Sequence, residues 1–116
     1  MNFRGKFYKE SNDIRIASAG RGKIRVKMEL IYPYTLKNGD LMANLGEMDN
    51  EFAIDGDTAT YTSGQCTIWI KFLRPGTIKV EQQGTDGDCG FGHNVMSDGT
   101  YRKVSGKKPN FEEGQP

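Results

Sequence analysis

The fold is decided by a strict alternation of charged and apolar residues, Lys23-Ile24-Arg25-Val26-Lys27-Met28-Glu29-Leu30. A β-strand points successive side chains to opposite faces, so the apolar residues of this stretch would line one face and the charged residues the other. A helix would instead distribute the charges around its axis. The stretch therefore predicts a strand with one buried and one solvated face.

Similar patterns along the chain predict further short strands, because alternation and enrichment in Thr, aromatic and β-branched residues favour extended structure. They are expected at residues 3–8, 14–18, 41–47, 51–54, 58–62, 67–72, 77–81 and 100–104. Turn sequences separate these segments. The pairs Asn38-Gly39, Asp55-Gly56 and Asp98-Gly99 suit tight hairpin turns, and Arg74-Pro75-Gly76-Thr77 suits a type II turn.

About eight or nine short antiparallel strands with short connections predict an all-β meander closed into a small lipocalin-like barrel. This barrel domain is expected to span residues 1–104, followed by a polar, solvated C-terminal tail at residues 105–116. The chain of 116 residues is the size of a single domain.

Composition argues against two classes of partner. Sixteen basic and fifteen acidic residues give a net charge of +1, without the basic excess of nucleic-acid-binding proteins. No apolar run approaches the roughly 18 residues that a membrane-spanning helix needs. Met1-Asn2-Phe3-Arg4 leads directly into strand-like sequence, so we expect a mature domain whose signal peptide is absent from this chain. A native cytosolic start is the alternative.

The two cysteines are placed so that a disulfide can join them. Cys66 has the same parity as Ile68 and Ile70 and should face the core, whereas Cys89 lies in a long Gly-rich connection at residues 83–95. A bridge would hold that connection against a core strand. Two free thiols, as expected in a reducing compartment, are the alternative.

No residue cluster predicts catalysis, a metal site or a cofactor. His93 is the single histidine, and Asp86-Gly87-Asp88 resembles part of a calcium loop but lacks its downstream glutamate. No nucleophile elbow or phosphate-binding glycine loop is found, so we expect a protein that is not an enzyme.

We interpret two charged rows as solvated strand surfaces. They are Arg21, Lys23, Arg25 and Lys27, and the carboxylates Glu47, Asp49, Glu51, Asp55 and Asp57.

Four residues are the candidates for binding. Trp69 should point outward between Thr67 and Lys71, and exposed tryptophan is enriched at binding hot spots. Packing beneath the connection at residues 83–95 is the alternative for this side chain. Phe91, His93 and Asn94 lie within that connection, and long loops on a rigid scaffold often carry binding sites.

Three motifs carry a resemblance to a known group of proteins: the strand that begins at Cys66, the C-G-F-G sequence at residues 89–92 and the D-G-T-Y sequence at residues 98–101. Together they resemble a domain of secreted and periplasmic bacterial proteins that occurs alone or beside lysozyme-inhibitor-like modules. The opening F-R-G-K-F-Y at residues 3–8 is similar to the start of small lipocalin-like barrels. The resemblance implies a periplasmic or secreted, disulfide-bonded β-barrel.

The resemblance does not extend to inhibitory residues. Barrel inhibitors of c-type lysozyme carry S-G-x-x-Y and Y-x-x-x-T-K-G motifs, whereas this chain has Ser63-Gly64-Gln65-Cys66-Thr67 and no T-K-G. We therefore expect a non-enzymatic binding or inhibitor module that contacts an unidentified protein through a loop end of the barrel. The alternative function is a lipocalin-like carrier of a small apolar ligand, which we disfavour because side chains fill the interior of small barrels.

Overall fold

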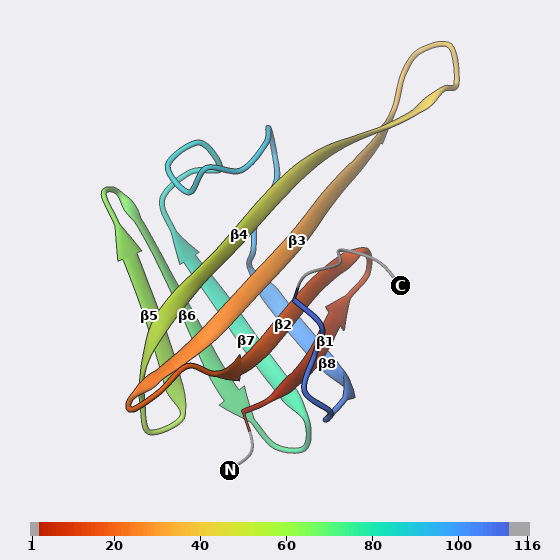
Figure 1. Ribbon diagram of the computed structural model, residues 1–116. Helices are drawn as coiled ribbons and strands as arrows, with labels where there is room; N and C mark the ends of the chain where they lie inside the picture. Colours follow the sequence, from red (N-terminus) through yellow and green to blue (C-terminus); the bar gives the residue numbers. More distant parts are fainter. Residues whose placement is uncertain (1–2, 112–116) are drawn as a thin grey trace.

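The computed structural model describes residues 3–111, which form eight strands and no helix. The strands are β1 (Gly5–Lys9), β2 (Asn12–Ser18), β3 (Lys23–Thr35), β4 (Leu41–Asp55), β5 (Thr58–Ser63), β6 (Cys66–Leu73), β7 (Thr77–Gln83) and β8 (Gly99–Ser105). Each pairs antiparallel with the next, and β1 pairs with β8 to close the barrel (Figure 1). The predicted all-β meander barrel is confirmed.

The barrel interior is filled by apolar side chains that every strand contributes. Alternation places these residues inward because successive strand residues face opposite sides of the sheet. The most deeply buried large side chains are Tyr101, Phe7, Phe52, Ile14, Ile16, Met28, Leu30, Ile68, Ile70, Ile78, Val26 and Val80. They belong to one continuous hydrophobic cluster.

The hairpin of β3 and β4 is much longer than the sequence predicts. The two strands expected at residues 41–47 and 51–54 are one strand of 15 residues, and β3 continues to Thr35. Their register runs without a bulge from Lys23↔Ala53 to Thr35↔Leu41. Met48 keeps the inward parity across the polar residues that suggested a break, and it is buried. We call residues 31–45, which project beyond the barrel, the arm (Figure 1).

The predicted turns have different outcomes. Asn38-Gly39 forms the apex of the arm, and Asp55-Gly56 connects β4 to β5. Asp98-Gly99 was predicted as a hairpin turn, and this is wrong. Asp98 ends the long β7–β8 loop (residues 84–98), Gly99 is the first residue of β8, and Asp98 accepts a hydrogen bond from the Gln82 N–H. The Arg74–Pro75 peptide is cis, and Gly76 has a φ of 57°.

The segment after β8 differs from a free solvated tail. Lys107 and Lys108 are exposed, but Phe111 is only 7% exposed. The Phe111 ring lies 4.3 Å from the Arg25 guanidinium, and the Phe111 carbonyl accepts a 2.7 Å hydrogen bond from Lys27. Arg15 donates to the carbonyl of Asn110. Residues 106–111 therefore fold back over the outer face of β2 and β3; residues 112–116 lie outside the described part of the chain.

A membrane-spanning helix is not found within residues 3–111, where all regular structure consists of strands.

Candidate binding surface

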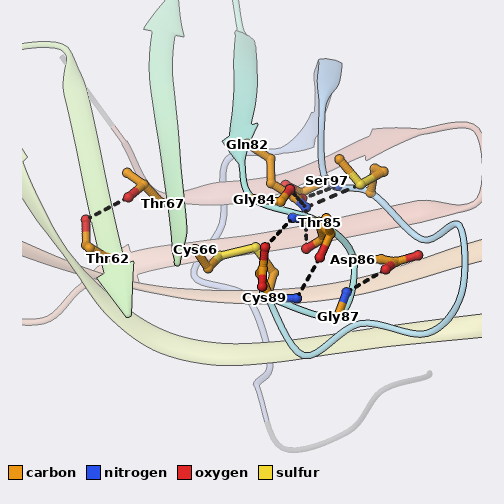
Figure 2. The surroundings of a disulfide bond; sticks show 12 residues. Thr62, Cys66, Thr67, Gln82, Gly84, Thr85, Asp86, Gly87, Cys89 and Ser97 are labelled. Atoms are coloured by element: carbon orange, nitrogen blue, oxygen red, sulfur yellow. Dashed lines mark hydrogen bonds between the residues drawn. A yellow bond between two sulfur atoms is a disulfide. The ribbon is translucent and has the colours of Figure 1, made fainter. Parts of the chain in front are cut away.

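A disulfide fixes the β7–β8 loop to the barrel. The Cys66 and Cys89 sulfurs are 2.06 Å apart, which confirms the predicted bridge (Figure 2). Cys66 lies at the start of β6 and is buried, so it gives the loop an anchor in the core.

Two aspartates organise the loop around this anchor. Asp86 accepts hydrogen bonds from the N–H groups of Gly87 and Asn94, both at 2.6 Å, and these bonds lower the pKa of its carboxyl group. Asp88 accepts a bond from the Thr85 N–H (2.9 Å), while the Thr85 hydroxyl accepts one from the Asp88 N–H (3.1 Å). Asp86 and Asp88, whose sequence resembles part of a calcium loop, therefore accept hydrogen bonds from backbone N–H groups of their own loop.

A chain of hydrogen bonds also ties the loop to the barrel interior. The buried Tyr101 hydroxyl donates to the Ser97 carbonyl (2.9 Å) and accepts from Asn12 (3.3 Å). The Ser97 hydroxyl and N–H both donate to the Gln82 side chain, at 2.6 and 2.9 Å. Burial is the main cause that raises the pKa of Tyr101 to about 12, so the phenol stays a hydrogen-bond donor well into the alkaline range.

The loop in turn supports the base of the arm. Phe91 and Val95 are buried against Gly46 of β4, where a Cβ atom would lie 2.8 Å from a carbon of each. Gly92 donates its N–H to the Leu45 carbonyl (2.9 Å), and the Asn44 side chain donates to the His93 carbonyl (2.9 Å). These contacts join the disulfide-anchored loop to the base of the arm, and the loop and the arm lie at the same end of the barrel (Figure 1).

The arm carries most of the exposed apolar side chains of the molecule. Six of the ten large hydrophobic residues that are exposed in the described chain lie on it: Ile31, Tyr32, Leu36, Leu41, Met42 and Leu45. Leu41 is 80% exposed and Leu45 is 58% exposed. The exposed apolar side chains of the described chain are thus concentrated on the arm.

Sequence reasoning missed the arm, although a signal for it is present. Alternation ends at Leu30, and the following residues Ile31-Tyr32-Pro33-Tyr34 are apolar or aromatic at both parities. The same holds for Leu41-Met42-Ala43 on the returning strand. A strand whose two faces are both apolar is expected to pack against other elements on both sides. The barrel packs against neither face of the arm.

The predicted binding residues of the loop divide into two groups. His93 has an 82% exposed side chain, with its Nδ1 3.9 Å from an Asp86 carboxylate oxygen, and Asn94 is exposed with a φ of 65°. Phe91 was also predicted as a binding residue, but it is 7% exposed and packs into the core. Its packing holds the loop in position, and its role in binding stays a prediction. Its parity could not be read from the sequence because the loop lacks a regular period.

Trp69 lies on the outer wall of the barrel, away from this group of residues. It is partly buried on β6 between Thr60 and Glu81, as its outward parity predicts. With Thr58, Lys71, Lys79 and Glu81 it lines an open hollow of about 360 Å³. Because no β7–β8 loop residue lines that hollow, Trp69 is not part of the surface that the loop and the arm form.

The basic row is neutralised by the acidic row of the neighbouring strand. Arg25 makes a two-bond contact with Asp49, at 2.9 and 2.6 Å, and Lys23 lies 3.7 Å from Glu51. The Arg25 hydrogen bond lowers the pKa of Asp49. Carboxylates and the C-terminal segment thus engage Lys23, Arg25 and Lys27 of this row.

Metal ligands do not cluster within residues 3–111: no group of three His, Cys, Asp or Glu side chains is placed to hold an ion. Comparison with protein families, with curated proteins and with solved structures gives no match. The resemblance based on the C-G-F-G loop and the D-G-T-Y strand therefore stays a prediction.

Proposed function

We propose that this protein is a non-enzymatic binding or inhibitor module that engages another protein through the surface formed by the β7–β8 loop and the arm. The observation that carries the proposal is the support of an exposed apolar arm by a loop that is itself anchored to the core. Recognition sites gain affinity when their loops are ordered before binding. Here a disulfide, the Asp86 and Asp88 hydrogen bonds and the Phe91–Gly46 contact supply that order.

We further propose that the protein acts outside the cytoplasm, in the periplasm or after secretion. A disulfide that anchors the binding surface is stable in an oxidising compartment and would be reduced in most cytosols. The resemblance to secreted and periplasmic bacterial domains points the same way.

The carrier alternative receives less support from the interior of the barrel. A carrier needs an apolar cavity of several hundred cubic ångströms. In this barrel Phe7, Phe52 and Tyr101 are almost completely buried in a single cluster with the aliphatic side chains of all the walls.

The proposal is tested by site-specific photo-crosslinking in the source cells. Photoreactive benzoylphenylalanine is placed at position 93 or 94 of the loop, or at position 73 at the opposite end of the barrel, where Leu73 is 37% exposed. We expect the loop positions to crosslink to one polypeptide and the control position to crosslink to none. Equal labelling at position 73, or no protein adduct at positions 93 and 94, would contradict the proposal.

A further inference from the structure

The two faces of the arm are both largely apolar, and they differ in chemistry. Residues directly opposite in an antiparallel pair share a face, and the pair Leu30↔Gly46 fixes which face continues the barrel interior. That inner face bears Tyr32, Tyr34 and Met42, with the two tyrosine ring centroids 6.5 Å apart, and Asn44 at its base. The outer face is mostly aliphatic and bears Ile31, Pro33, Leu41, Ala43 and Leu45, with Thr35 opposite Leu41.

The β3 edge of the arm is closed to strand addition. The Ile31 N–H points away from β4, because it donates to the Asn12 side chain (2.8 Å). Pro33 has the same parity and carries no N–H, so the β3 edge cannot extend a hydrogen-bond ladder past it. On the β4 edge the Leu45 carbonyl accepts the Gly92 N–H, whereas the backbone groups of Ala43 and Leu41, which share its parity, face outward. Strand addition is therefore confined to this short outer part of β4, and the two faces of the arm offer a partner the larger surface.

The apex of the arm is polar and argues against a lipid bilayer as the partner. Lys37, Asn38 and Asp40 form the turn, with the Asn38 side chain donating to Asp40 (3.1 Å) and accepting from its N–H (2.9 Å). Insertion would carry these charged and amide groups into hydrocarbon ahead of the apolar residues, at a cost of several kcal/mol. The same groups are well suited to a polar protein surface.

The size of each face argues against a simple dimer of arms. Five residues span roughly 17 Å, and two strands span about 10 Å, so one face covers roughly 170 Å² in flat projection, with a larger accessible surface because its side chains stand out from it. A stable interface buries about 800 Å² of accessible surface on each partner. Contact of one face with one flat partner falls short of this area. A partner that encloses both faces and the apex of the arm and also contacts the β7–β8 loop would bury an area closer to that of a stable interface.

From these features we infer that the arm inserts into a cleft of the partner protein. One wall of that cleft is aliphatic and packs on Leu41 and Leu45, the other packs on the Tyr32 and Tyr34 rings, and the floor is polar and receives Lys37 and Asp40. This inference rests on the proposed function, because the partner of the loop is also the protein that encloses the arm.

Crosslinking from both faces of the arm tests the inference. Benzoylphenylalanine is introduced singly at position 45 (outer face), position 42 (inner face) and position 104 on β8, where Val104 is 57% exposed but distant in sequence from the arm. We expect positions 42 and 45 to give adducts with the same polypeptide that crosslinks to position 93. Position 104 should give none.

Other outcomes overturn the inference. Adducts from one face only would indicate a flat docking surface. Adducts with a second copy of this chain would indicate a dimer, and adducts with lipid would indicate a membrane contact. If position 93 crosslinks to a protein and positions 42 and 45 do not, arm insertion fails and the proposed binding function is confined to the β7–β8 loop. If none of the three crosslinks to a protein, both fail.

Paired substitutions give an independent measurement. In full-length protein with benzoylphenylalanine at position 93, Leu41→Ser/Leu45→Ser should reduce the crosslinked fraction at least tenfold, because both substitutions remove apolar surface that the partner would bury. Val104→Ser is the matched control and should leave the fraction unchanged. Equal crosslinking by the two variants would contradict arm insertion, provided that both retain the wild-type unfolding transition.

Discussion

Substitution of Gly46 by alanine tests whether the β7–β8 loop is packed on the arm as described. Gly46 lies within β4 and has no positive φ, so its backbone can accept an alanine. The added Cβ would lie 2.8 Å from Phe91 Cδ1 and 2.8 Å from Val95 Cγ1. Carbon atoms normally pack about 3.5–4.0 Å apart, so one of these side chains must move.

Two opposing effects set the size of the change in stability. Overpacking a closely packed site costs about 1–3 kcal/mol. Replacing glycine by alanine inside a strand recovers about 0.5–1 kcal/mol of backbone entropy. Because Phe91 is two residues from the disulfide and buried, it cannot move away freely. We therefore expect Gly46→Ala to lower the free energy of unfolding by about 0.5–2 kcal/mol.

Urea unfolding under non-reducing conditions measures this change. Gly106→Ala is the control, since nothing lies within 4 Å of its Cβ position, and it should stay within about 0.5 kcal/mol of wild type. Val95→Ala removes one of the two colliding carbons, so the double variant should be more stable than the sum of the single effects by at least about 0.5 kcal/mol. A Gly46→Ala protein as stable as wild type, or additive single effects, would refute the contact.

Three further substitutions test other parts of the structure. Cys66→Ala/Cys89→Ala should lower the free energy of unfolding by about 3 kcal/mol and increase amide exchange in the β7–β8 loop more than in any hairpin turn; unchanged exchange there would contradict the anchoring role. Tyr101, with its pKa raised to about 12 by burial, contributes stability that is complete below pH about 10 and is lost as the pH rises toward its native pKa. Tyr101→Phe should abolish that alkaline loss and cost about 1–2 kcal/mol at neutral pH, as measured by unfolding between pH 7 and about 11. The lowered pKa of Asp49 stabilises the native state above pH about 5, and this contribution disappears as the pH falls through the native pKa. Asp49→Asn should thus cost less than about 1 kcal/mol at pH 7 and reduce the acid dependence of unfolding; an unchanged acid dependence would show that Arg25 does not hold this carboxylate.

The sequence predicts the barrel well because a strand with one wet and one buried face has an obvious pattern. Lys23 to Leu30 and Cys66 to Phe72 both alternate strictly, and the structure places both in the wall of the barrel. The disulfide also follows from parity, since Cys66 shares the inward face of Ile68 and Ile70.

The candidate binding surface was harder to predict because tertiary contacts create it. The length of the arm depends on the register between β3 and β4, which the separate patterns of the two strands do not specify. The burial of Phe91 depends on Gly46, 45 residues away in the chain, leaving space for its ring. The Phe111 position likewise depends on contacts with Arg25 and Lys27 that no local pattern reveals.

The junction between β1 and β8 has a mechanical consequence. β1 begins where β8 ends, with Lys6 opposite Ser105, so both strands leave the barrel at the same end of this junction. A force that pulls these two ends apart would break the β1–β8 hydrogen bonds one after another, because only the outermost bond carries the load at any time. The barrel should then open by peeling at low force. The bridge between Cys66 and Cys89 has a sequence separation of 23, so the fully stretched chain would be roughly 80 Å shorter with the bridge intact than after its reduction.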